Sequence, residues 1–128
     1  MRLLLDTHTV LWLVNEHEKL SLKAKSLIVD DEHDLFVSIA SFWEVAIKSS
    51  LGKLTDFVGG VGAFTTQIDK MPIELLHITP HHVGIVESLP FIHRDPFDRI
   101  LIATAKAENL TILTSDANIT RYDVSCVW

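Results

Sequence analysis

Short apolar runs alternate along the chain with longer segments whose apolar residues recur every three to four positions. The short runs predict buried strands, and the longer spacing predicts helices with one buried face. By this pattern, strands are predicted at 1–6, 34–40, 72–79, 111–114 and 122–128. Helices are predicted at 7–20, 21–32, 41–54, 80–89 and 95–110, and residues 55–71 predict a glycine-rich loop leading into a helix of low propensity.

Strands that alternate with helices are typical of a parallel sheet covered on both faces. No repeat, low-complexity segment or linker divides the sequence, so residues 1–128 are predicted to form a single α/β domain. The content of 48% apolar and 22% charged residues fits a globular protein.

Targeting signals and membrane spans are not expected. The longest uncharged stretch, 57–68, is far short of the roughly 20 residues that a span needs. The N-terminal MRLLLD reaches an acid too early for a signal peptide. The only cysteine, Cys126, cannot form an intrachain disulfide, which is in keeping with a reducing cytoplasm.

The net charge of −6 argues against a broad basic surface of the kind that holds duplex DNA. It does not exclude a nuclease, because metal-binding acids lower the net charge where a polyanion must approach and a bound cation restores the sign. The charge also suits a basic protein partner.

Four acids occupy corresponding places in the predicted elements. Asp6 and Asp116 follow the ends of strands, and Glu44 and Asp98 lie about one turn into helices. The carboxyl ends of parallel strands gather at one edge of a sheet, so these side chains are expected to share one crevice. Two carboxylates about 4 Å apart repel by roughly 4 kcal/mol at an effective dielectric near 20, and a divalent cation would remove this repulsion. All-oxygen ligands favour Mg²⁺ or Mn²⁺ over Zn²⁺.

Helix capping is the alternative explanation for each acid taken singly. Asp6 and Asp116 are placed to cap helices, and Asp95, which precedes a proline, is predicted to be an N-cap. The segment SFWE at 41–44 fits a capping box, and Asp98 would favour a helix dipole. Caps need not share an edge of the sheet, whereas the ligands of one metal must.

Other polar groups near these acids have weaker assignments. Thr7 and Ser115 are expected to orient carboxylates or bind water, or to be ordinary turn hydroxyls, and His8 and His93 are expected to pair with backbone carbonyls. Three basic residues could contact phosphates, namely Lys48, Arg94 and Arg99. Lys48 is also spaced for a helical ion pair with Glu44.

The segments LLLDTHTVLW, VSIASFWEVAIKSSLGKL, LPFIHRDPFDRILIATA and TILTSD, in this order, resemble the PIN-domain family. The resemblance is strongest to its VapC-like ribonuclease toxins of bacterial toxin–antitoxin pairs. It spans nearly the whole chain, with HRDPFDRILIATA as its most specific part, and it is weakest over residues 55–72, whose role is left open.

This resemblance implies a three-layer α/β/α fold around a parallel sheet of about five strands. It implies that Asp6, Glu44, Asp98 and Asp116 form an acidic quartet that binds Mg²⁺ or Mn²⁺, with Asp95 in a supporting role. It also implies hydrolysis of RNA phosphodiester bonds, a homodimer, and inhibition by a small antitoxin. The RNA target, the number of ions and the general base are left open.

Two other functions are considered. The first is phosphatase chemistry with Asp6 as a nucleophile, but such enzymes carry a second acid two positions later, where this chain has His8. The second is a metal-binding module without nuclease activity that acts through a protein partner.

Overall fold

The computed structural model describes all residues, 1–128, and contains one five-stranded sheet with the order β3-β2-β1-β4-β5. All four strand pairings are parallel. The strands are β1 Arg2–Leu5, β2 Asp34–Ser38, β3 Ile73–Leu76, β4 Thr111–Leu113 and β5 Cys126–Val127. The predicted parallel sheet of about five strands is confirmed.

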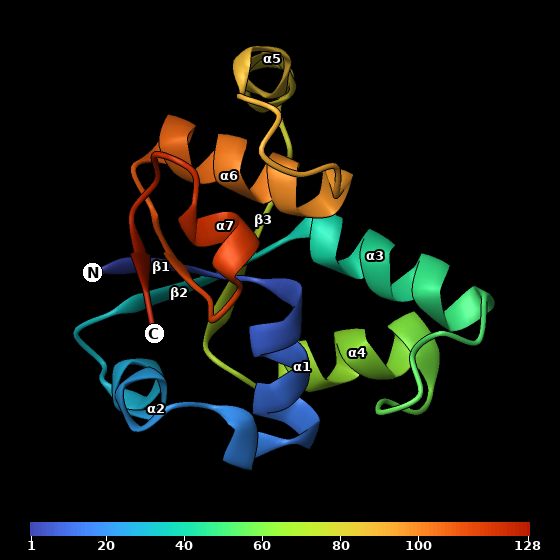
Figure 1. Ribbon diagram of the computed structural model, residues 1–128. Helices are drawn as coiled ribbons and strands as arrows, with labels where there is room; N and C mark the ends of the chain where they lie inside the picture. Colours follow the sequence, from blue (N-terminus) through green and yellow to red (C-terminus); the bar gives the residue numbers. More distant parts are fainter.

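Helices cover both faces of this sheet, which confirms the predicted three-layer α/β/α arrangement. The helices are α1 Thr7–Asn15, η1 His17–Lys19 (a 3₁₀ turn), α2 Leu22–Val29, α3 Ile39–Ser50, α4 Gly60–Asp69, α5 Pro80–Ser88, α6 Pro96–Glu108 and α7 Ala117–Thr120. Figure 1 shows α5 and α6 on one side of the strands, with α1 and α2 on the other. None of the helices combines the length and apolarity that crossing a bilayer requires.

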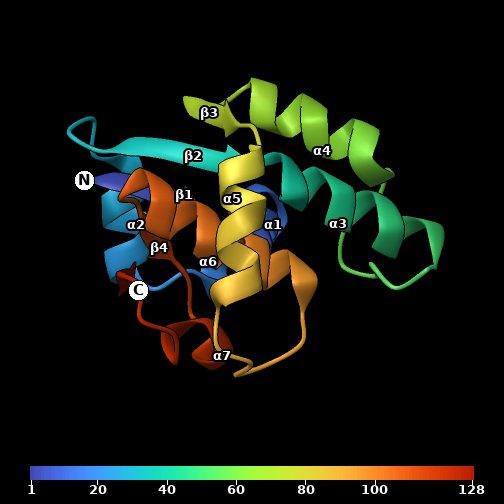
Figure 2. The same ribbon diagram turned by 90° about the horizontal axis from the view of Figure 1, so that it is seen from above.

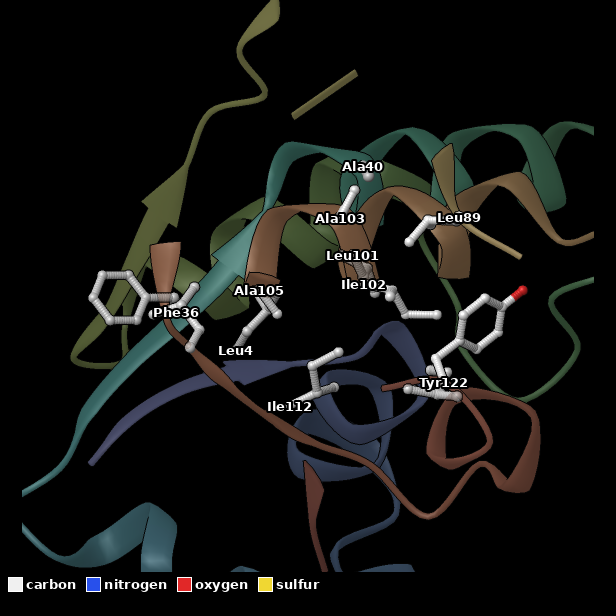
Figure 3. Close-up of a cluster of buried hydrophobic side chains, with 12 residues drawn as sticks. Leu4, Phe36, Ala40, Leu89, Leu101, Ile102, Ala103, Ala105, Ile112 and Tyr122 are labelled. Atoms are coloured by element: carbon white, nitrogen blue, oxygen red, sulfur yellow. The ribbon is translucent and has the colours of Figure 1, made fainter. Parts of the chain in front are cut away.

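Alternate residues of each strand enter two separate hydrophobic cores, as the pleat of a β-strand dictates. Leu4, Phe36 and Ile112 pack with α5, α6 and α7 on one face (Figure 3). Leu3, Leu5 and other residues of the same strands pack with α1, α2, α3 and α4 on the opposite face. The central strand β1 is therefore apolar at every buried position.

The carboxyl ends of β1, β2 and β4 lead into α1, α3 and α7 at the same edge of the sheet. Figure 2 shows β2 continuing into α3, with α4 alongside that helix. This edge carries Asp6 directly after β1, Asp116 between β4 and α7, and Glu44 in the second turn of α3. The fold thus positions the predicted site.

Three segments refine the sequence-based predictions. The capping box at 41–44 is wrong, because β2 runs directly into α3 and Ser38 caps that helix through Ala40 N at 3.0 Å. The strand predicted at 122–128 covers only Cys126–Val127, since the chain turns from Arg121 to Val124. The loop and helix predicted for 55–71 are confirmed by α4, which follows Gly59 at a φ of +103°.

Candidate functional site

Asp6 caps α1 and is also buried beside the end of β4. Its Oδ1 accepts a hydrogen bond from Thr9 N at 2.7 Å, and its Oδ2 accepts one from Thr114 Oγ1. Only 4% of Asp6 is exposed, and this burial raises the pKa of its carboxyl group. The capping explanation is therefore correct, but it leaves a desolvated acid at the sheet edge.

Glu44 is the second buried acid, with 3% of the residue exposed. Lys48, one turn later on α3, donates to Glu44 Oε2 at 2.5 Å, which confirms the predicted ion pair. Burial lowers the pKa of Lys48, but the hydrogen bond to Glu44 and the charges of Glu44, Asp95 and Asp98 outweigh it, so the pKa is raised. The Lys48 ammonium group is thus stabilised by the negative charges of acids on α3 and at the start of α6.

Asp98 lies in the first turn of α6, and its Oδ2 is 2.9 Å from His93 Nε2. Its pKa is raised to about 7 by burial and by the charges of Asp95, Asp116 and Glu44, against the lowering effect of the hydrogen bond from His93. Carboxylates from separate parts of the sequence therefore repel one another at Asp98. His93 was predicted to pair with a backbone carbonyl, but in the structure its ring nitrogens contact the Tyr122 hydroxyl and the Asp98 carboxylate.

Asp95 caps α6, accepting from Phe97 N at 2.9 Å and from Asp98 N at 3.3 Å, as predicted. Asp116 caps the short α7 by accepting from Asn118 N at 2.8 Å. The half-buried Asp116 thus has a structural role in addition to its electrostatic effect on Asp98.

Thr114 connects two of the acids and was missed by the sequence analysis. Its hydroxyl group donates to Asp6 Oδ2 and accepts from Asp116 N at 3.0 Å. The sequence analysis named the neighbouring Ser115 instead, which is exposed. Thr7, the other predicted hydroxyl, is buried and donates to Ser41 Oγ at 2.9 Å, so neither predicted hydroxyl contacts a carboxylate. Thr114 lay inside the strand predicted at 111–114, so no signal in the sequence identified it.

The three predicted basic residues have different environments. Lys48 pairs with Glu44, and Arg94 is exposed. Arg99 is only 5% exposed, and its guanidinium group donates to backbone carbonyls and to Tyr122. A phosphate contact needs access to solvent, which Arg99 lacks, so its burial corrects this part of the prediction.

The four acids, Asp6, Glu44, Asp98 and Asp116, are termed the acidic site below. No three Asp, Glu, His or Cys side chains are grouped closely enough in this structure to hold a metal ion. Each of the four carboxylates instead accepts a hydrogen bond from the protein. Their chemistry nevertheless fits a hard divalent cation, because all are oxygen donors. At Asp98, the charges of Asp95, Asp116 and Glu44 add to burial in raising the pKa, which indicates negative charge that no nearby cation balances.

A groove of about 190 Å³ adjoins the acidic site at Lys48. His8 and Trp12 of α1 form one wall, and the lining contains the two bases Lys48 and Lys53 as well as the two acids Glu16 and Asp56. Trp12 is held in place by Trp128, whose ring centroid is 5.8 Å away. This combination of aromatic and charged side chains next to the acidic site was not predicted from the sequence.

Comparisons with known proteins agree with this architecture. The family model described as PIN domain matches residues 3–125. VapBC2 from Rickettsia felis, bound to a DNA fragment from its promoter, has a similar fold, with a TM-score of 0.73 and 15% identity over 99% of this chain and 98% of that chain. DNA-bound VapBC from Salmonella typhimurium gives a TM-score of 0.70 with 14% identity, covering 99% of this chain and 97% of that chain.

A toxin–antitoxin complex from Klebsiella pneumoniae has a TM-score of 0.56 and 16% identity, covering 98% of this chain and 95% of that chain. At these identities the likeness concerns the fold. No match to the sequence is found among curated proteins.

Proposed function

The chain belongs to the PIN-domain family, and we propose that it is an Mg²⁺- or Mn²⁺-dependent endoribonuclease. The observation that carries the proposal is the family match over residues 3–125. It is supported by the concentration of acids around Asp98, whose pKa is raised to about 7 by burial and by the charges of Asp95, Asp116 and Glu44. A structural capping role needs no such concentration of negative charge, whereas a cation-binding site does.

The reaction assigned to the site is hydrolysis of a phosphodiester bond. A bound cation would supply activation of a water molecule and stabilisation of charge on the phosphate. The chain itself holds Asp6 through Thr9 and Thr114 and holds Asp98 through His93. One carboxylate of the site takes the proton from the attacking water, and the family resemblance implies products with a 5′-phosphate and a 3′-hydroxyl.

The groove beside the acidic site supports single-stranded RNA as the substrate. Bases stack on aromatic side chains at about 1–3 kcal/mol each, and lysines contact the backbone. His8 and Trp12 provide the aromatic wall, and Lys53 is the lysine of this groove that pairs with no acid. A strand cut at the acidic site would place its neighbouring nucleotide here.

The toxin role in a toxin–antitoxin pair is supported by the fold that this chain shares with the VapBC and toxin–antitoxin complexes. By that likeness its partner is a small antitoxin protein, and its location is the cytoplasm.

Exposed apolar residues support the homodimer. Trp43 is 62% and Val83 is 56% exposed, and both line a cavity of about 370 Å³ between α3, α5 and α6. A second copy would cover this surface, and Val83→Glu should then yield a monomer by light scattering.

Cleavage of transfer RNA in Mg²⁺ tests the proposed activity. The wild-type protein should cleave, while chelator or the substitution Asp98→Asn should prevent cleavage without unfolding the chain. Equal activity of the Asp98→Asn protein would refute the mechanism. Binding of Mn²⁺ without any cleavage would instead support the metal-binding module that acts through a partner.

The phosphatase alternative receives no support from the structure. Both carboxylate oxygens of Asp6 accept hydrogen bonds, and the residue is 4% exposed. A carboxylate in that environment is poorly placed to attack a phosphate.

A further inference from the structure

We propose that His93 is a positioning residue for Asp98, and that Tyr122 and the buried Arg99 fix which nitrogen of His93 faces the acid. The inference rests on the proposed function, because it concerns how Asp98 is prepared for a cation. It specifies how His93 holds Asp98, and it assigns roles to Tyr122 and Arg99, which the proposed reaction does not use.

The three side chains form a continuous series of hydrogen bonds that ends at the acidic site. Arg99 Nη1 donates to the Tyr122 hydroxyl oxygen at 3.0 Å. This oxygen is 2.8 Å from His93 Nδ1, and His93 Nε2 is 2.9 Å from Asp98 Oδ2. The series therefore starts and ends near the beginning of α6, and it passes through Tyr122, which follows α7, and His93, which precedes α6.

The valence of the Tyr122 hydroxyl group determines the direction of each bond. The oxygen already accepts from Arg99 Nη1 and from the backbone N of His93 at 3.3 Å, and both of these groups can only donate. Its two acceptor positions are thus used, and its one proton goes to His93 Nδ1 at 2.8 Å in preference to the carbonyl of His93 at 3.5 Å, the other acceptor within reach. His93 therefore carries its proton on Nε2 and donates it to Asp98 Oδ2.

Arg99 makes this arrangement rigid. Its guanidinium group donates to the carbonyl of Pro90 at 2.8 Å and to those of Val86 and Leu89 at 3.4 Å, and it is paired with no carboxylate. Carbonyl and phenol oxygens do not gain or lose a proton near neutral pH. Arg99 therefore remains a donor in a fixed position. Figure 3 shows Tyr122 at the rim of the core with its hydroxyl group turned away from the aliphatic side chains.

The consequence concerns Asp98. Its Oδ2 is held by a neutral donor, while its Oδ1 accepts no hydrogen bond and is left for a cation. Glu44 differs, since it is held by the charged Lys48, which competes with a metal ion. A neutral donor orients the carboxylate without cancelling its charge, which is how outer groups support metal ligands.

The ring nitrogens of His93 can be observed directly by long-range ¹H–¹⁵N NMR of the metal-free protein. The His93 signals, identified by their loss in His93→Gln, should show the Nε2–H tautomer, and Tyr122→Phe should abolish this preference. His82 is an internal reference, because its Nδ1 accepts from Thr79 N at 3.1 Å and its Nε2 faces Glu108 at 2.8 Å. An Nδ1–H tautomer in the wild type, or an unaltered His93 pattern in Tyr122→Phe, would overturn the proposal.

Calorimetric titration with Mn²⁺ tests the positioning role without reference to cleavage. His93→Leu should weaken Mn²⁺ binding by roughly 10- to 100-fold, the usual effect of losing a group that supports a metal ligand. His93→Gln, which keeps an N–H donor, should restore most of the affinity. The matched control is His82→Leu, which removes a buried histidine–carboxylate pair outside the acidic site and should leave Mn²⁺ affinity unchanged.

These results separate the two proposals. If Asp98→Asn binds Mn²⁺ as tightly as the wild type, the proposed function fails. If Asp98→Asn loses Mn²⁺ but His93→Leu and Tyr122→Phe retain it, then only the positioning role is refuted. Circular dichroism of each variant confirms folding, and Tyr122→Phe keeps the buried ring should His93→Leu fail to fold.

Discussion

The strand half and the helix half of the acidic site hold their carboxylates by different means. In the strand half, at the ends of β1 and β4, Asp6 and Asp116 accept hydrogen bonds from backbone N–H groups, and Asp6 also accepts one from Thr114. These donors are neutral and belong to the fold itself. The strand half is therefore a fixed frame whose charge is not balanced by any cationic side chain.

In the helix half, on α3 and α6, the partners are titratable side chains. Glu44 is paired with Lys48, and Asp98 is paired with His93. The charge of Lys48 would have to be displaced from Glu44 by an entering cation, whereas His93 holds Asp98 as a donor fixed by Tyr122. Under the proposed function, the strand half would set the location of a bound cation and the helix half would control its affinity.

The largest expected effect comes from removing a charge in the strand half. Asp6→Asn should lower the rate of RNA cleavage by more than about 100-fold, the upper range for loss of a mere supporting group. Its melting temperature should stay equal or rise, because the buried charge is removed while the amide oxygen still accepts from Thr9. Asp31→Asn, an exposed acid before β2, is the control and should cleave normally.

Loss of both activity and stability in Asp6→Asn would show that this acid is purely structural.

The next effect tests whether the strand half is a rigid frame. Thr114→Val keeps the side-chain shape but leaves a buried carboxylate oxygen of Asp6 without its donor, which should cost about 1–3 kcal/mol in the free energy of unfolding. Urea denaturation measures this change. Thr104→Val is the matched control, because the equally buried Thr104 hydroxyl donates only within its own helix, to Ile100 O. Equal losses in both variants would contradict a special role for Thr114.

A smaller effect of opposite sign is expected in the helix half. Lys48→Met removes the cation that occupies Glu44, so Mn²⁺ should bind roughly threefold to tenfold more tightly, equivalent to about 0.7–1.4 kcal/mol. The metal-free protein should melt at a lower temperature because Glu44 is then buried without a partner. The increase in melting temperature on adding Mn²⁺ measures both changes. A weaker response than that of the wild type would mean that Lys48 assists cation binding.

The smallest effect is a dependence of stability on pH. The pKa of Asp98 is raised from 3.8 to about 7, so the folded protein retains a proton that the unfolded chain releases. This contribution to stability is fully present below pH 3.8 and is lost as the pH rises through 7. The raised pKa of Asp6 acts in the same direction.

The melting temperature of the metal-free wild type should therefore fall more steeply between pH 5 and pH 8 than that of Asp98→Asn, by a few degrees. Added Mn²⁺ should remove the difference, because it binds the deprotonated site. Parallel pH profiles of the two metal-free proteins would contradict the raised pKa.

The fold and the positions of the four acids could be predicted from the sequence, because each depends on a local pattern of residues. Apolar strands alternating with helices determine a parallel sheet, and acids placed after such strands lie at one edge of it. The start of α3 was missed because β2 enters the helix without a loop. The pattern of apolar and polar residues in VSIAS, at 37–41, is compatible with either a strand or a helix. No local signal distinguishes Ser38 from Ser41 as the cap.

Features that depend on distant contacts were not accessible. Arg99 directly follows Asp98 in the sequence, yet it is buried because carbonyls at the end of α5 and the Tyr122 hydroxyl surround it. Thr114 acquires its role only through pairing with a residue 108 positions earlier. The groove likewise needs Trp12 and Lys53 to meet across α1 and the loop after α3.

The position of β1 has a consequence for protein synthesis. This strand is translated before the other four but lies between β2 and β4, and Asp6 is held by a hydroxyl that is translated 108 residues later. A ribosome-bound nascent chain that ends before α6 carries Asp6 and Glu44 but neither Asp98 nor Asp116. The acidic site is therefore assembled only after the segment from α6 to α7 has left the ribosome.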